Sequence, residues 1–155
     1  MTTTQLPDTA SPSPLEVDLA VLPKVSLHDH LDGGLRVRLG RVRAAVFDVD
    51  GTLTDGRLYY APDGGELKVF HVHDGHGIKA LRAAGIEVAL CSARGVAAVE
   101  ARARDLGIAH VYQGVGDKRA SVDAFCAELG IAADAMLFMG DDLADLPALR
   151  VAGVA

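Results

Sequence analysis

The amino-acid sequence predicts an α/β fold, a doubly wound and mostly parallel sheet of the Rossmann-like kind. From residue 41 onward, short apolar runs alternate with segments of helical character. Continuous apolar runs of this length are typical of strands that are buried on both faces. Strands that alternate with helices form βαβ units, whose neighbouring strands are parallel. Ligands of such sheets bind beyond the carboxyl ends of the strands, so we expect the functional residues there.

The first strand is expected at residues 42–48, an apolar run that ends in an acid. A hairpin is expected next, because apolar segments at 58–60 and 67–72 flank the turn signal Pro62-Asp63-Gly64-Gly65. The later elements alternate: a helix at 77–84, a strand at 86–92, a helix at 95–106 ending at Gly107, a strand at 110–112, a helix at 117–129 between an Asp117 N-cap and Gly130, a strand at 135–139, a helix at 143–150 and the start of a strand at 153–155.

Composition restricts the class of protein. The chain has 155 residues, 50% of them hydrophobic and 23% charged, which is a globular balance. Its net charge of −6 argues against a nucleic-acid partner, which calls for a basic surface. No apolar run approaches the roughly 20 residues that cross a bilayer, and no signal peptide is visible. With only two cysteines, Cys91 and Cys126, the sequence predicts a cytoplasmic protein that works without a membrane.

Residues 1–40 differ in character from the rest of the chain. Residues 1–14 are rich in Thr, Ser and Pro, and we expect all of 1–40 to be a flexible extension of a domain at 41–155. Within it, residues 22–36 resemble the start of adenosine deaminases, in which a His-x-His pair binds zinc. Here the pair is His28 and His30, but the rest of a deaminase barrel does not follow. We therefore expect an orphan fragment, and zinc at these two residues is the alternative.

Acidic residues follow two of the expected strands. Asp48 and Asp50 surround the end of the first strand, and Asp141 and Asp142 follow the strand at 135–139. Carboxylates that converge at one edge repel one another unless a cation joins them, and Mg²⁺ prefers such oxygen ligands. Gly51 lets the chain turn sharply behind the first pair. Each acidic pair alone is as readily a turn or a helix cap, and Asp142 as an N-cap is an alternative.

Two further polar residues lie near the same expected edge of the sheet, one at a strand end and one at the start of a helix. Ser92 ends the second strand, and Lys118 lies in the first turn of a helix, where the helix dipole disfavours a cation. A cation there is explained if it binds an anion. Taken together with the acids, these residues predict a functional site that holds a metal ion and an anion.

The motifs resemble those of the haloacid dehalogenase-like (HAD-like) superfamily, carried here by DxDGT from Asp48 to Thr52, then Ser92, Lys118 and GDD from Gly140 to Asp142. The stretches DVDGTLTDGRLYY, GELKVFHVHDGHGIK, YQGVGDK and FMGDDLADLPAL are similar to the 3-deoxy-D-manno-octulosonate 8-phosphate phosphatases, over residues 41–155. This resemblance implies a Mg²⁺-dependent phosphatase that acts on a small phosphorylated sugar acid. It also implies a capless fold whose hairpin insertion, residues 56–72, joins a homotetramer, and a place in lipopolysaccharide biosynthesis.

The resemblance implies the following roles for individual residues. Asp48 is the nucleophile, and Asp50 is the general acid and base. The metal ligands are Asp48, the main-chain carbonyl of Asp50, Asp141 and Asp142. The phosphate and substrate contacts are Gly51, Thr52, His71, His73, Asp74, Gly75, Lys79, Ser92, Arg94 and Lys118.

The sequence departs from this family in several places. His73 stands where the family commonly has Arg, and Arg94 belongs to CSAR where the family usually has TGR. His71, His73 and His76 could instead form a metal cluster, with the first two on one face of a strand. The chain stops at Ala155, where the family continues, so we expect a truncated domain. The alternatives are a phosphatase for another ester, such as a nonulosonate 9-phosphate, and a non-catalytic assembly or binding module.

Overall fold

The computed structural model describes residues 31–155, and residues 32–155 form one compact unit. His28, His30 and the expected tail at 1–14 lie outside the described residues. The unit begins with α1 (Gly33–Leu39), which falls inside the range expected to be a flexible extension. Asp32 caps this helix by accepting a hydrogen bond from the Gly34 amide at 2.9 Å. Helical structure therefore begins before residue 41.

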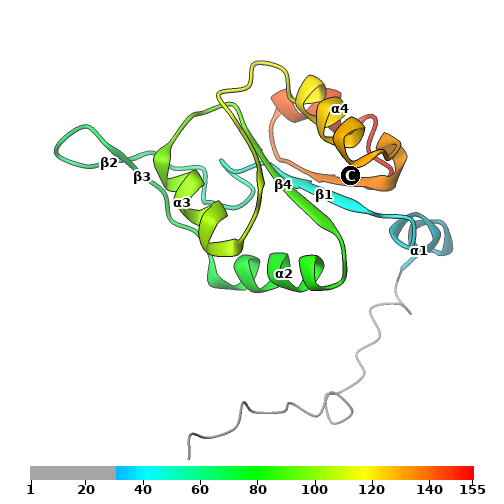
Figure 1. Cartoon of the computed structure of the whole chain (residues 1–155). Helices are drawn as coiled ribbons and strands as arrows, with labels where there is room; N and C mark the ends of the chain where they lie inside the picture. The colour runs from blue at the N-terminus through cyan, green and yellow to red at the C-terminus, as the bar shows by residue number, and fades with distance from the viewer. Residues whose placement is uncertain (1–30) are drawn as a thin grey trace, which may run out of the picture. The chain divides into compact units, whose positions relative to one another are not determined.

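The centre of the unit is a parallel sheet of four strands (Figure 1). They are β1 (Ala44–Phe47), β4 (Glu87–Ser92), β5 (His110–Gln113) and β6 (Met136–Met139), in the order β5-β4-β1-β6. Val154 adds an isolated parallel bridge to Leu137, where the sequence predicts the start of a strand. The predicted α/β fold with a parallel sheet is confirmed.

Helices cover both faces of this sheet, as Figure 1 shows. On one face lie α2 (Val72–Ala83) and α3 (Ala97–Leu106), and on the other α4 (Lys118–Leu129) and α5 (Leu146–Leu149). The side chains of β1 alternate between the two cores that result. Ala45 and Phe47 belong to the core beneath α2 and α3, whereas Ala44 and Val46 belong to the core beneath α4 and α5. Burial on both faces explains why β1 is apolar throughout.

The predicted hairpin is present but shorter than expected. Its strands are β2 (Tyr59–Tyr60) and β3 (Glu66–Leu67), which form a separate antiparallel pair that projects away from the main sheet (Figure 1). The Ala61 amide donates to the Gly65 carbonyl at 2.7 Å and closes the turn. Residues 68–71 leave the hairpin and lead towards α2.

The prediction for residues 71–77 was wrong in its secondary structure. Helix α2 begins at Val72, five positions before the predicted start at Gly77. His71 is the N-cap, and its Nδ1 accepts a hydrogen bond from the His73 amide at 3.1 Å. Because His71 is a cap and His73 lies in the first helical turn, they do not share a strand face as the metal-cluster alternative required. The cap and the packing of α2 outweigh the low helix propensity of the two glycines at 75 and 77.

The other predicted boundaries agree to within two residues, with one exception. Asp117 caps α4, and Gly107 and Gly130 end α3 and α4 in the left-handed conformation, as expected. The predicted helix at 143–150 is instead a 3-10 turn, η3 (Leu143–Asp145), followed by α5. A further 3-10 turn, η2 (Ala133–Ala135), precedes β6. No helix within residues 31–155 has the length and apolar character needed to cross a membrane.

Candidate functional site

The carboxyl ends of β1, β4 and β6 bring residues from distant parts of the chain to one edge of the sheet. Asp48 follows β1, Ser92 ends β4, and Asp141 lies two residues after β6. The strand order changes direction at β1, since the chain moves outward through β4 and β5 and then returns to β6 on the other side. This is the topological switch point at which open α/β sheets bind ligands.

Lys118 brings two buried acids of this edge together. Its ammonium group donates hydrogen bonds to the carboxylates of Asp48 and Asp145. All three side chains are at most 5% exposed. The helix that carries Lys118 starts at the Asp117 cap, which fixes the direction in which Lys118 enters the site. The cation therefore serves carboxylates of the protein itself in this structure.

Burial and neighbouring charges shift the pKa values of Asp48 and Lys118. Burial raises the pKa of the Asp48 carboxyl, and the hydrogen bond and charge of Lys118 only partly oppose it. Burial alone would lower the pKa of Lys118, but its two carboxylate partners outweigh burial and raise it. Lys118 is thus a cation at neutral pH, and additional positive charge near Asp48 would favour the ionised form of this carboxyl.

The loop after β1 is tied to the loop after β6. The Thr52 hydroxyl donates to the Asp141 carboxylate at 3.0 Å. Gly51 lies under the same carboxylate with φ of +100°, and a Cβ at this position would collide with Asp141. Both Gly51 and Thr52 therefore act on the position of Asp141, whereas the sequence predicted contacts with phosphate.

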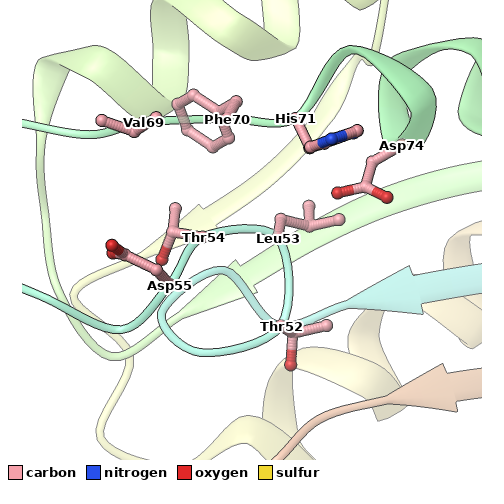
Figure 2. Close-up of a pocket in the computed structure, with 8 residues that line it drawn as sticks. All are labelled: Thr52, Leu53, Thr54, Asp55, Val69, Phe70, His71 and Asp74. Atoms are coloured by element: carbon pink, nitrogen blue, oxygen red, sulfur yellow. The ribbon is translucent and has the colours of Figure 1, made fainter.

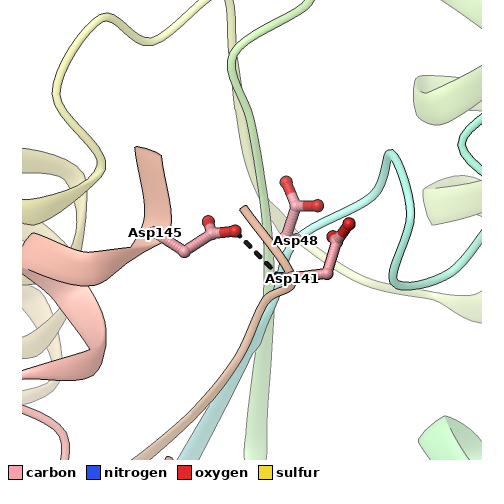
Figure 3. Close-up of side chains that lie close together, drawn as sticks. All are labelled: Asp48, Asp141 and Asp145. Atoms are coloured by element: carbon pink, nitrogen blue, oxygen red, sulfur yellow. Dashed lines mark hydrogen bonds between the residues drawn. The ribbon is translucent and has the colours of Figure 1, made fainter. Parts of the chain in front are cut away.

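Three carboxylates can together supply ligands to one cation. Oxygen atoms of Asp48, Asp141 and Asp145 lie within 4.8 Å of one another, and Figure 3 shows the three side chains beside one another at this edge. The second oxygen of Asp145 accepts from the amides of Asp141 and Asp142, at 3.1 and 3.0 Å. Asp145 was missing from the predicted site, although its place one turn after GDD was a usable signal.

The side chains of Asp142 and Asp50 have partners within the protein. The Asp142 carboxylate accepts from the Leu143 amide at 2.6 Å and caps η3, the alternative that the sequence left open. The Asp50 carboxylate is turned towards Ser92 and Lys68: the Ser92 hydroxyl donates to one oxygen at 3.3 Å, and Lys68 donates to the other. Lys68 was not predicted as a site residue.

Lys68 belongs to a second charged cluster at the base of the hairpin. Its ammonium also donates to Glu66 at 2.9 Å, and Glu66 accepts from the Arg94 guanidinium. Hydrogen bonds from Arg94 and Lys68 lower the pKa of Glu66. Burial would lower the pKa of Lys68, but Asp50 and Glu66 outweigh it and raise it. The stretch GELK contains Glu66 and Lys68, yet nothing local marks these two residues as neighbours of Asp50.

The structure separates the predicted substrate residues of 71–79. A cavity of about 290 Å³ lies between the loop after β1 and residues 69–74, and both His71 and Asp74 line it (Figure 2). Gly75 is buried, and a Cβ there would meet Arg102 and Leu106, so this glycine allows close packing of α2 on α3. His73 and Lys79 are exposed on α2 and do not line this cavity. A second cavity, of about 400 Å³, lies beside Lys118.

Comparison with known proteins agrees with this geometry. The model of the haloacid dehalogenase-like hydrolases matches residues 65–153. A hypothetical protein from Xanthomonas campestris is 54% identical, with a TM-score of 0.80 over 86% of this chain and 72% of that one. The chain belongs to the haloacid dehalogenase-like hydrolase family.

Within this hydrolase family, the chain is similar to the 3-deoxy-D-manno-octulosonate 8-phosphate phosphatases. The enzyme of Escherichia coli K12 is 40% identical over 113 residues, which are 73% of this chain and 60% of the relative. The chain thus spans about 60% of the length of such curated relatives. The Moraxella catarrhalis phosphatase, solved with magnesium, phosphate and KDO, is 40% identical, with a TM-score of 0.74 over 76% of this chain and 67% of that one.

Proposed function

We propose that this chain is a Mg²⁺-dependent phosphatase that hydrolyses 3-deoxy-D-manno-octulosonate 8-phosphate through an aspartyl-phosphate intermediate. The observation that carries the proposal is the cluster of Asp48, Asp141 and Asp145 around Lys118 at the switch point of the sheet. Relatives named for this activity share the fold and about 40% of the residues, and one of them contains magnesium, phosphate and KDO.

The donor atoms fit a magnesium ion. Asp48, Asp141 and Asp145 offer hard oxygen ligands, and the family resemblance implies a further one, the main-chain carbonyl of Asp50. One ammonium group, on Lys118, faces Asp48 and Asp145, so the three carboxylates carry more negative charge than it balances. Bound Mg²⁺ would supply the positive charge that screens Asp48 from the phosphate and stabilises the transition state.

The reaction begins with the carboxylate of Asp48. One of its oxygens forms a bond to phosphorus while the bond from phosphorus to the sugar oxygen breaks. Asp50 donates a proton to the departing oxygen, so that the sugar leaves as an alcohol. Asp50 then takes a proton from water, whose oxygen attacks phosphorus and releases Asp48. Lys118 binds the phosphoryl oxygens during both steps, and Ser92 joins it when its single hydroxyl proton turns from Asp50 to the phosphate.

Two finer proposals concern the setting of this activity. We propose a homotetramer that forms through the hairpin, because Tyr60, Leu67 and Val69 there are 65%, 56% and 61% exposed. Light scattering after size exclusion tests this, and a monomer at micromolar concentration contradicts it. We also propose that the protein acts in the cytoplasm, because its two cysteines, Cys91 and Cys126, are buried free thiols, as is usual in a reducing compartment.

Phosphate release from the purified chain tests the proposed activity. We expect release from 3-deoxy-D-manno-octulosonate 8-phosphate with Mg²⁺ and none with EDTA. Faster release from a nonulosonate 9-phosphate would change the substrate while keeping the reaction. No release from any phosphate monoester would contradict the proposal and favour a binding module.

A further inference from the structure

The carboxylate of Asp50 lies in a closed ring of hydrogen bonds that joins three segments of the chain. Lys68 donates to one Asp50 oxygen and also to Glu66, which accepts from the Arg94 side chain. The main-chain amide of Arg94 donates to the Ser92 hydroxyl at 3.1 Å, and that hydroxyl donates to the other Asp50 oxygen. The ring therefore returns to Asp50 through the loop after β1, the hairpin and the end of β4.

Both carboxylate oxygens of Asp50 thus accept hydrogen bonds from residues in other segments of the chain. The partners lie 18 and 42 positions away along the chain, so the loop after β1 does not by itself fix the direction of this side chain. A carboxylate with two partners on opposite oxygens has one favoured orientation, whereas one with a single partner can rotate. Removing Lys68 would leave Asp50 with the longer of its two contacts.

Burial sets Lys68 apart from an ordinary surface lysine. Its side chain is 1% exposed, and the Glu66 side chain beside it is 11% exposed. An exposed ion pair contributes little, and a buried ammonium group costs desolvation unless carboxylates satisfy it. Glu66 supplies one such carboxylate. The second is the carboxylate of Asp50, which transfers the protons in the proposed mechanism.

We propose that Lys68 is a positioning residue for Asp50, held in place by Glu66 and Arg94, and that the base of the hairpin thereby sets the orientation of the general acid. This inference rests on the proposed function. A general acid acts only when its proton points at the leaving oxygen, and a misplacement of about 1 Å can cost about 100-fold in rate. Lys68 acts through Asp50 and does not itself transfer a proton.

The test compares two leaving groups in the full chain. A sugar alkoxide needs protonation by Asp50, whereas the nitrophenolate of p-nitrophenyl phosphate leaves without it. Because Asp50 activates water for both esters in the second step, the comparison uses the first step alone, measured as the release of the leaving group in a single turnover. For Lys68→Met we expect this release from 3-deoxy-D-manno-octulosonate 8-phosphate to slow about 10- to 100-fold, with KM changed by less than about threefold. We expect the release of nitrophenolate to slow by less than about threefold.

Further variants separate positioning from a loss of structure. Lys68→Arg keeps a cation that can reach both carboxylates, and we expect it to recover most of the rate. Glu66→Gln weakens the hold on Lys68 and should show the same dependence on the leaving group, to a smaller extent. Arg104→Met removes a cation from an exposed pair on α3 and should change neither rate. Melting curves identify any variant that fails to fold. If Lys68→Met fails to fold, the rates of the single variants Lys68→Arg and Glu66→Gln decide whether Lys68 positions Asp50.

The outcomes distinguish this inference from the proposed function. If the wild-type chain hydrolyses both esters but Lys68→Met slows the first step by the same factor on each, Lys68 has only a structural role and the inference is overturned. Unchanged rates for Lys68→Met overturn it as well. If the wild-type chain hydrolyses neither ester, the proposed function fails and this inference fails with it.

Discussion

Lys118 and Asp145 form an ion pair in the interior of the protein, with side chains that are 5% and 0% exposed. The same ammonium group binds Asp48, so one cation stands between two buried acids. Removal of Lys118 would leave the two buried acids charged without compensation. The position of the Asp141 carboxylate, the third acid of this edge, depends on the hydrogen bond from Thr52 and on the cation that binds there.

Replacing Lys118 with Met should destabilise the fold strongly. We expect the free energy of unfolding without Mg²⁺ to fall by about 3–5 kcal/mol, because Asp48 and Asp145 remain buried and face each other. Urea denaturation measures this change. Arg104→Met, at an exposed pair, is the control and should cost no more than about 1 kcal/mol. A similar small loss for Lys118→Met would show that Lys118 does not balance these acids.

Asp48→Asn should remove turnover and leave the fold intact. The amide has the size of the carboxylate and keeps a hydrogen-bonding oxygen, but it cannot attack phosphorus. We expect phosphate release to fall by at least about 100-fold, measured beside far-ultraviolet circular dichroism. A variant that keeps more than about a hundredth of the wild-type rate contradicts the assignment of Asp48 as nucleophile.

Magnesium should stabilise the protein through the three acids. We expect Mg²⁺ at about a hundred times its Kd to raise Tm by about 5–10 °C, since it binds only the folded site. Asp141→Asn should remove most of this shift. Deletion of residues 1–31 should leave it unchanged, because every carboxylate of the cluster lies in the unit that begins at Asp32. Loss of the shift on deletion would place the metal at His28 and His30 instead.

Gly51→Ala tests the close approach of the loop after β1 to Asp141. The φ of +100° disfavours any side chain, and the new Cβ would displace the carboxylate. We expect a loss of about 1–3 kcal/mol in unfolding free energy and a smaller Mg²⁺-induced rise in Tm. Gly77→Ala is the matched control, because nothing lies near its Cβ position and its φ is not positive. Equal behaviour of the two variants would contradict a special role for Gly51.

Cys91 should weaken the fold at alkaline pH. Burial raises the pKa of its thiol from 9.0 to about 11. Above pH 9 the unfolded chain loses this proton first, so the thiol favours the unfolded state increasingly as the pH rises to about 11. Below pH 9 the thiol is protonated in both states and has no such effect.

Urea midpoints at pH 8 and pH 10.5 measure this effect, with Cys91→Ala as the reference. We expect the wild-type chain to lose more stability over this interval than the variant does. An equal loss in both would show that the thiol does not contribute, and that other groups, such as Tyr112 with its raised pKa, account for the change.

Local signals in the sequence determined the fold class and the residues of one edge. Apolar runs of strand length, separated by helices, are enough to predict a parallel sheet, because burial on both faces requires them. Asp48, Ser92 and Asp141 follow strand ends directly, so their convergence needs only the rule that parallel strands end together. Asp117 and Gly130 bound α4 as expected, since caps depend on neighbours in the sequence.

Tertiary structure decided which partner each of these groups has. Asp145 binds Lys118, and Asp142 caps its own turn, although both acids follow the same strand. Lys68 reaches Asp50 because the chain between hairpin and helix folds back to the edge of the sheet, and α2 begins early because His71 caps it. These choices depend on burial and on distances between segments far apart along the chain. Spacing in the sequence carries no record of them, which is the physical reason that the strand ends could be predicted but the ring around Asp50 could not.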